Sequence, residues 1–150
     1  MMILIVEDDE HKSSQILEIV KGNSRYENNY QLVDNVRDAV RFLIKMIPQK
    51  IVLDMSLPSH KALPGQGNPV PLPTGGIELL FELKKRALLN LPILILTQYP
   101  EIEIEEEPIP VEESALAFEE EYGFTNLEAY YYDQIHDAEW KKSINSFLLK

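Results

Sequence analysis

The sequence of 150 residues contains no cysteine, which excludes disulfides, thiolate metal sites and a cysteine nucleophile. It also has no apolar run long enough to span a bilayer, and no basic segment of the kind that opens a signal peptide precedes its first apolar residues. A chain without disulfides, leader or membrane span suits a reducing compartment. We therefore expect a cytoplasmic protein with no membrane partner.

Basic residues are scarce. The chain has 14 Lys and Arg against 25 Asp and Glu, for a formal net charge of −11. Nucleic-acid binding depends on Lys and Arg that neutralise phosphates, so this balance argues against a nucleic-acid partner. Ten Glu, with no Lys or Arg, lie in residues 101–121. We interpret this segment as a solvated loop and helix face, with a dedicated surface for a basic partner as the alternative.

The remaining composition is that of a globular protein, with 45% hydrophobic and 26% charged residues. A length of 150 residues fits one domain with a sizeable core. We therefore expect a single domain that spans residues 1–150.

Hydrophobic patterning predicts strands that alternate with helices. The expected strands are residues 3–6, 30–33, 51–53, 93–96 and 129–132. Apolar residues at helical spacing predict helices that begin near residues 9, 34, 75, 111 and 137. Such alternation implies right-handed crossovers and a parallel sheet covered on both faces. The predicted class is α/β, a flavodoxin-like doubly wound sheet of five strands in the order 2-1-3-4-5.

Two long insertions interrupt this pattern. Residues 57–74, between the third strand and the third helix, hold five Pro and two Gly and are expected to form a long loop. Residues 98–110, between the fourth strand and the fourth helix, combine three Pro with an alternating EIEIEEE run. That pattern is consistent with an edge strand or with an extended loop.

Acidic residues follow the first and third predicted strands. Glu7, Asp8 and Asp9 end the first strand, and Asp54 ends the third. The carboxyl ends of neighbouring parallel strands meet at one edge of the sheet, so these carboxylates should converge there. Carboxylates brought together repel unless a cation is present, and Mg²⁺ prefers such oxygen ligands. A carboxylate held there can attack a phosphoryl donor to form an acyl phosphate. The structural alternative is that Asp8 or Asp9 caps the first helix.

Four segments in register resemble the receiver domains of bacterial response regulators. They are ILIVEDDE at residues 3–10, IVLDMSLP at 51–58, GGIELL at 75–80 and PILILT at 92–97. The resemblance covers nearly the whole chain. It implies that the domain at residues 1–150 is a single receiver-like domain, and the chain is too short for a receiver with a separate output domain. It implies a signalling protein and not an enzyme, phosphorylated by a histidine kinase or phosphotransfer protein and acting on a downstream protein target. Formation of a homodimer is compatible with it.

The resemblance also assigns site residues. It implies that Asp54 is the phosphoacceptor, and that Glu7, Asp8, Asp54 and the backbone carbonyl of Ser56 bind Mg²⁺. Thr97 matches the hydroxyl that contacts the phosphoryl group, and Tyr130 falls at the position of the family's switch aromatic.

One departure from the family pattern concerns a cation. The family carries a Lys followed by Pro at the end of the fifth strand, where this chain has Asp133 and Gln134. Lys61, in the Pro-rich loop, is a candidate substitute, unless it is simply a solvent-facing loop residue. The departure supports an alternative function, a pseudo-receiver that binds proteins without phosphorylation. A phosphoaspartate hydrolase would normally want a second acid at position 56, which is Ser.

Overall fold

The computed structural model describes residues 2–67 and 69–150. Its main sheet has five parallel strands in the order β2-β1-β3-β4-β7. The strands are β1 (Ile3–Val6), β2 (Tyr30–Val33), β3 (Lys50–Leu53), β4 (Ile93–Thr97) and β7 (Leu127–Tyr131). The predicted α/β class and the order 2-1-3-4-5 are confirmed, with β7 in the fifth place.

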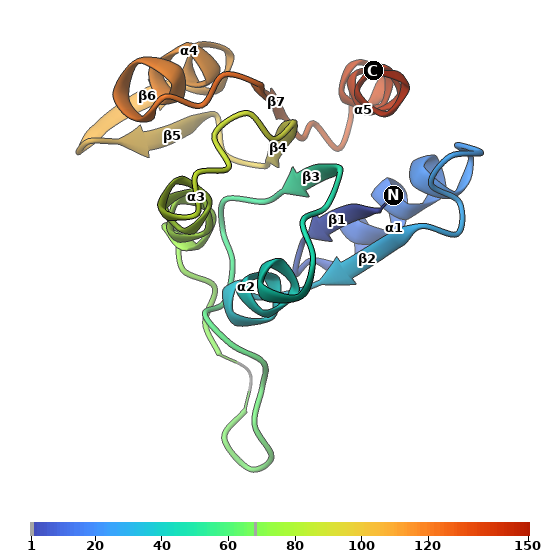
Figure 1. Cartoon of the computed structure of the whole chain (residues 1–150), viewed down its shortest axis with the longest axis vertical. Helices are drawn as coiled ribbons and strands as arrows, with labels where there is room; N and C mark the ends of the chain where they lie inside the picture. The colour runs from blue at the N-terminus through green and yellow to red at the C-terminus, as the bar shows by residue number, and fades with distance from the viewer. Residues whose placement is uncertain (1, 68) are drawn as a thin grey trace.

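Helices cover both faces of this sheet (Figure 1). They are α1 (Glu10–Lys21), α2 (Val36–Lys45), α3 (Gly75–Lys85), α4 (Val111–Tyr122) and α5 (Ala138–Leu149). One apolar cluster joins the sheet to α2, α3 and α4, and a second joins its other face to α1 and α5. The central strands are buried on both faces, which explains why β1 and β4 are apolar without alternation.

The helix boundaries follow the local signals in the sequence. Asn35 caps α2 by accepting a hydrogen bond from the backbone N–H of Asp38. Gly123 follows α4 with a φ of 86°, a left-handed conformation that glycine adopts without a steric penalty. None of the helices in residues 2–67 and 69–150 is long and apolar enough to cross a membrane.

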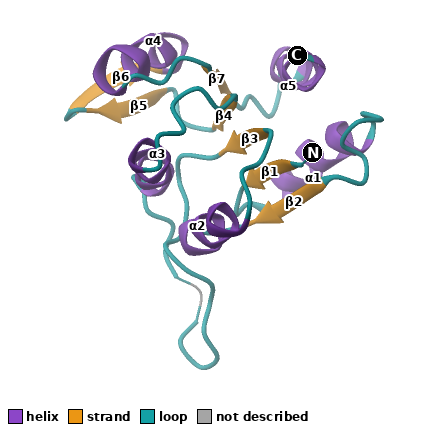
Figure 2. Cartoon of the chain, in the orientation of Figure 1, coloured by secondary structure: helices purple, strands orange, loops and turns teal. Residues whose placement is uncertain are grey.

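The alternating segment at residues 98–110 forms a β-hairpin. It consists of β5 (Glu101–Ile104) and β6 (Glu107–Pro110), paired antiparallel in a sheet of their own (Figure 2). Ile102 and Ile104 are buried against α4 while the Glu side chains between them face solvent. Of the two readings of this segment, the edge strand is confirmed for residues 101–104, because β5 is an edge strand of this two-stranded sheet, and the extended loop is wrong. The pairing with β6 was not predicted.

The fifth strand of the main sheet begins at Leu127, two residues before the predicted start. The expectation missed this start because Glu128 interrupts the apolar pattern. The strand lies at the edge of the sheet and its side chains are only half-buried, so it tolerates a charged residue.

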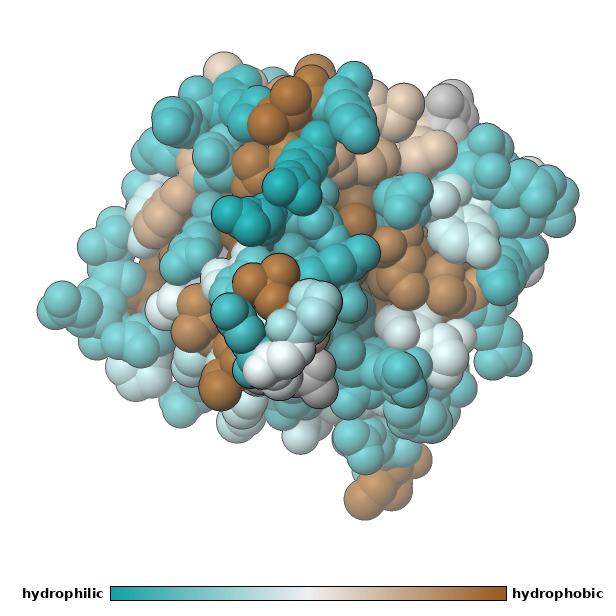
Figure 3. Space-filling model, turned by 90° about the horizontal axis from the view of Figure 1, so that it is seen from below, coloured by the Kyte–Doolittle hydropathy of each residue, from teal (hydrophilic) through white to brown (hydrophobic). Residues whose placement is uncertain are grey.

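The Pro-rich segment forms the predicted loop and projects away from the sheet (Figure 1). Its base is closed by two backbone hydrogen bonds between Leu57 and Leu72. The carbonyls of Pro58 and Ser59 accept hydrogen bonds from the first two N–H groups of α2. Figure 3 views the molecule from the side on which the loop projects, and apolar patches there lie among hydrophilic ones. Leu63 and Val70, both in the loop, are exposed.

Candidate functional site

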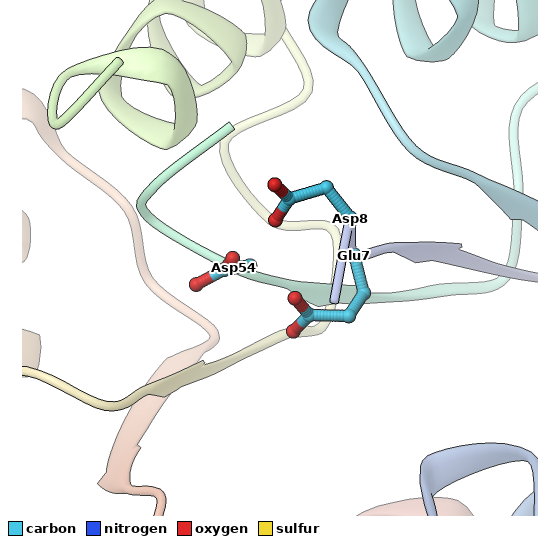
Figure 4. Close-up of side chains that lie close together, drawn as sticks. All are labelled: Glu7, Asp8 and Asp54. Carbon is cyan, nitrogen blue, oxygen red and sulfur yellow. The ribbon is translucent and has the colours of Figure 1, made fainter. Parts of the chain in front are cut away.

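Three carboxylates meet at the carboxyl ends of β1 and β3 (Figure 4). Glu7, Asp8 and Asp54 each offer an oxygen, and these oxygens lie within 4.8 Å of one another. The backbone positions them: Asp54 N–H donates to the carbonyl of Val6, and Glu7 N–H donates to the carbonyl of Val33. The parallel ladder therefore brings together residues that are 46 or more positions apart in the sequence.

Asp9 caps the first helix and is not part of the carboxylate cluster. Its Oδ1 accepts a hydrogen bond from the backbone N–H of Lys12 at 2.8 Å, which makes Asp9 the N-cap of α1. Asp8 makes no such cap and remains with Glu7 and Asp54. The capping alternative thus applies to Asp9 and not to Asp8.

Burial raises the pKa values of two carboxyl groups of this cluster, those of Glu7 and Asp8. Glu7 and Asp54 are almost fully buried. Loss of hydration raises the pKa of Glu7 to about 8, although the nearby Lys12 ammonium opposes this rise. Burial, together with the neighbouring Asp54 carboxylate, raises the pKa of Asp8 to about 6. A divalent cation would relieve both effects.

The donor set fits such a cation. Asp54 Oδ2 is buried and accepts no hydrogen bond within the described chain, which leaves one carboxylate oxygen for an external partner. Carboxylate oxygens from three residues are hard ligands of the kind that Mg²⁺ and Mn²⁺ prefer.

A cation is already present in the site, and it comes from α1. The ammonium of Lys12 lies 2.7 Å from Glu7 Oε1 and 3.2 Å from Asp54 Oδ1. It also donates to the carbonyl of Leu96 at 2.6 Å and to Gln98 Oε1 at 3.3 Å. The residue is 1% exposed. Lys12 thus links the acidic cluster to the end of β4.

The sequence expectation for this cation was different. Lys61 lies in the projecting loop, 70% exposed, and pairs with Asp38 at 3.5 Å, so it is not the cation of the cluster. The family pattern places the cation at the end of the fifth strand, and Lys61 was the predicted substitute, so the prediction did not include a residue of the first helix. The signal was present, because Lys12 stands four residues before Ile16 on the buried face of α1.

Asp133 is turned to a structural role. Its Oδ1 accepts hydrogen bonds from the backbone N–H groups of Ile135 and His136, both at 2.9 Å. These two donors lower the pKa of the Asp133 carboxyl. The side chain therefore shapes the turn before α5, and none of its described contacts reaches the acidic cluster.

The remaining candidates differ in their contacts. Ser56 and Thr97 are buried at the ends of β3 and β4, and the Thr97 hydroxyl accepts a hydrogen bond from the N–H of Tyr99. Tyr130 pairs with Leu96 in the sheet, and its hydroxyl donates to Glu128 at 3.0 Å. Burial raises the pKa of the Tyr130 hydroxyl.

The N-terminus of α3 packs closely on the segment after Asp54. Gly76 N–H donates to the carbonyl of Met55, and a Cβ at Gly76 would lie 2.7 Å from the carbonyl oxygen of Asp54. A Cβ at Gly75 would lie 2.6 Å from the carbonyl oxygen of Leu57. The Gly pair therefore permits a backbone approach that holds the phosphoacceptor candidate in place.

Comparison with known proteins gives the family. No family model matches the chain. The chain is 67% identical over 147 residues to the "Detocs response regulatory protein DtcB" of Vibrio alginolyticus, an alignment that covers 98% of this chain and 99% of the relative.

Solved structures share the fold at lower identity. The Mn(2+)-bound form of response regulator Rcp1 matches 97% of this chain and 89% of its own, with a TM-score of 0.65 and 20% identity. The phosphorylated cyanobacterial phytochrome response regulator RcpA gives a TM-score of 0.64 at 18% identity, with the same coverages. The signal receiver domain of a putative Luxo repressor protein from Vibrio parahaemolyticus gives 0.62 at 19%, over 99% of this chain and 89% of its own. The chain therefore belongs to the response-regulator family of two-component signalling, as a CheY-like receiver domain related to the Detocs response regulatory protein DtcB.

Proposed function

We propose that this receiver accepts a phosphoryl group on Asp54, and that Mg²⁺ is bound by Glu7, Asp8, Asp54 and the backbone carbonyl of Ser56. The observation that carries the proposal is the free oxygen of Asp54. Its Oδ2 is buried and unpartnered within the described chain, beside two further carboxylates. A buried oxygen without a hydrogen bond is unfavourable, and a ligand at this position would satisfy it.

The reaction follows from these groups. A carboxylate oxygen of Asp54 attacks phosphorus, an O–P bond forms, and the bond from phosphorus to the donor nitrogen breaks. For a phosphohistidine donor the imidazole leaves with the electron pair and takes up a proton. Bound Mg²⁺ would offset the negative charge that develops on the transferred oxygens. Glu7 and Asp8 would hold the Mg²⁺ at the strand ends, and Ser56 and Thr97 are buried at the same edge of the sheet.

The donor is proposed to be a histidine kinase or a phosphotransfer protein, in keeping with two-component signalling. The downstream target is proposed to be a protein that meets the face formed by α4, β7 and α5. Leu116, Tyr131 and Ile135 are exposed there, and the Glu-rich hairpin lies beside α4. Such a surface suits a partner with basic and apolar side chains. In this proposal residues 1–150 act as one receiver-like domain. The protein is proposed to act in the cytoplasm.

A phosphorylation-independent adaptor is the second candidate. The observation that favours it is the acidic Asp133 at the position of the family's Lys. The buried ammonium of Lys12 weighs against it, because the acidic cluster has a cation from another element.

Labelling with acetyl phosphate tests the proposal. The protein is incubated with and without Mg²⁺, and intact mass is measured for one added phosphoryl group. We expect Mg²⁺-dependent labelling of the wild type and none of Asp54→Asn. Absence of labelling under conditions that modify an ordinary receiver would refute phosphorylation and favour the adaptor.

A further inference from the structure

The cation of this site comes from a helix and not from the fifth strand. Lys12 projects from α1, between Asp9, which caps the helix, and Ile16, which packs in the core. Its ammonium contacts Glu7 and Asp54 directly. In the part of the chain that the structure describes, no other Lys or Arg forms an ion pair with either carboxylate.

Asp133, which aligns with the Lys of the family, makes structural hydrogen bonds in this chain. The Asp133 carboxylate binds two backbone N–H groups of the following turn, and its carbonyl accepts the indole N–H of Trp140 at 3.0 Å. Both polar ends of Asp133 are therefore engaged in anchoring α5. A cation at the acidic cluster must come from elsewhere.

We propose that Lys12 is the cation that contacts the phosphoryl group on Asp54, and that its movement toward that group is sensed by Tyr132 and Trp140. This inference rests on the proposed function, because it concerns the same site. The Lys12 ammonium is a compact positive charge with several N–H donors. It holds Asp54 Oδ1 and leaves Oδ2 unpartnered, so one carboxylate oxygen is engaged while the other is available for the new O–P bond.

Aromatic contacts connect Lys12 to the face made by α1 and α5. The ammonium lies 5.4 Å from the centroid of the Tyr132 ring, within the range of a cation–π contact. Tyr132 in turn packs on Trp140, with ring centroids 5.0 Å apart and planes at 51°. The Tyr132 hydroxyl donates to Gln15 on α1. Withdrawal of the ammonium toward a phosphoryl group would change the surroundings of both rings.

The chain has one Trp, so emission excited where Tyr does not absorb comes from Trp140 alone. We expect Mg²⁺ with beryllium fluoride, which mimics an acyl phosphate on Asp54, to change the Trp140 emission of the wild type. The change should be absent in Asp54→Asn and strongly reduced in Lys12→Gln. An equal change in Lys12→Gln would overturn the sensing role.

Labelling rates separate a charge effect from a loss of structure. We expect Lys12→Gln to slow labelling by acetyl phosphate at least tenfold at saturating Mg²⁺, and Lys12→Arg to retain more of the rate because it keeps the charge. Lys50→Gln is the matched control. Lys50 is also a buried lysine, and its ammonium donates to the carbonyls of Phe147 and Lys150, away from the cluster. Its loss should destabilise the fold and leave the labelling rate near that of the wild type.

Mg²⁺ affinity gives a readout that a merely structural lysine would not produce. Removal of a positive charge beside Glu7 and Asp54 reduces repulsion of a second cation, so Lys12→Gln should bind Mg²⁺ about tenfold more tightly while it labels more slowly. The titration is followed by calorimetry. An unchanged or weaker Mg²⁺ affinity in folded Lys12→Gln would overturn the assignment.

The two proposals fail in different ways. If the wild type is not labelled, phosphorylation of Asp54 is refuted, and the Mg²⁺ titration still decides whether Lys12 is the cation of the cluster. If the wild type is labelled and Lys12→Gln is labelled equally fast, the phosphoryl site stands and the role of Lys12 is refuted.

Discussion

The carboxylate of Asp9 accepts a hydrogen bond from the backbone N–H of Lys12 at 2.8 Å, so the residue that caps α1 also fixes the start of the turn that carries the buried ammonium. A cap satisfies one of the N–H groups that a helix leaves free at its first turn. The geometry of the cap and the direction of the Lys12 side chain are therefore set together.

We expect Asp9→Ala to lower the free energy of unfolding by about 1 kcal/mol, because an N-cap is lost. Asp9→Asn should be close to neutral, since its amide oxygen can accept the same hydrogen bond. Urea unfolding followed by circular dichroism measures both. An equal loss in Asp9→Ala and Asp9→Asn would show that the charge of Asp9, and not its cap, stabilises the helix.

The raised pKa values predict how metal-free stability depends on pH. The folded-state pKa is about 8 for Glu7 and about 6 for Asp8, above their ordinary values of 4.5 and 3.8. The folded state therefore holds these protons more tightly than the unfolded state. The resulting stabilisation is complete below about pH 4 and is lost as pH rises to about 8.

In EDTA we expect the melting temperature to fall between pH 6 and pH 8, by roughly 3–6 °C for a loss of about 1–2 kcal/mol. Saturating Mg²⁺ requires ionised carboxylates, so it should stabilise the protein more at pH 8 than at pH 6. Glu7→Gln is the control and should show a smaller fall. Identical pH profiles for Glu7→Gln and the wild type would contradict the assignment of this effect to Glu7.

Gly76 is predicted to be required for the close packing of α3 on the segment after Asp54. A Cβ there would lie 2.4 Å from Met55 Cε and 2.7 Å from the Asp54 carbonyl oxygen. Gly76→Ala must displace backbone next to Asp54, so we expect a loss of about 1–3 kcal/mol in unfolding free energy and weaker Mg²⁺ binding. Gly22→Ala is the matched control, because its Cβ would meet nothing closer than 3.4 Å. Thermal melts and Mg²⁺ titration of both variants give the comparison.

The hairpin turn contains strain that glycine would relieve. Glu105 and Glu106 have φ values of 51° and 67°, a conformation that favours Gly or Asn. The Tyr122 hydroxyl donates to Glu105 at 2.6 Å and helps to hold the turn. We expect Glu106→Gly to stabilise the protein by about 0.5–1 kcal/mol and Glu107→Gly, within a strand, to destabilise it. Opposite shifts in the melting temperature would support this reading, and a fall in both would refute it.

These two Glu residues also explain where the sequence was ambiguous. A two-residue hairpin turn is normally signalled by Asn-Gly or Asp-Gly, and Glu-Glu gives no such signal. The alternation of Ile102 and Ile104 with Glu predicted a strand face correctly, but the partner strand contains Pro108 and Pro110. The pairing depends on tertiary packing against α4, which local patterns do not encode.

The acidic cluster was predictable because it depends on topology alone. Asp54 and Glu7 end adjacent parallel strands, and the flavodoxin-like order 2-1-3-4-5, which the alternation of strands and helices suggests, placed those strands side by side. Prediction of the Lys12 contact required more information, namely the rotation of α1 about its axis and the reach of the lysine side chain. From the sequence alone, a lysine at a core position of a helix looks like a buried charge without a partner. The folded sheet provides its partners, Glu7 and Asp54.

The Pro-rich loop is predicted to be dispensable for the chemistry of the site. It leaves the domain at the paired residues Leu57 and Leu72 and projects away from the sheet, and its Lys61 pairs with Asp38 on α2 (Figure 1). A surface ion pair of this kind contributes about 0–1 kcal/mol.

A deletion of residues 62–70, with Gly-Ser as the replacement, retains Pro58 and Ser59, whose carbonyls cap α2. We expect the shortened protein to bind Mg²⁺ and to be labelled on Asp54 at the wild-type rate. A tenfold loss of labelling with unchanged Mg²⁺ affinity would instead assign the loop to recognition of the phosphodonor, and Lys61→Ala in the intact chain would then show whether its charge is responsible.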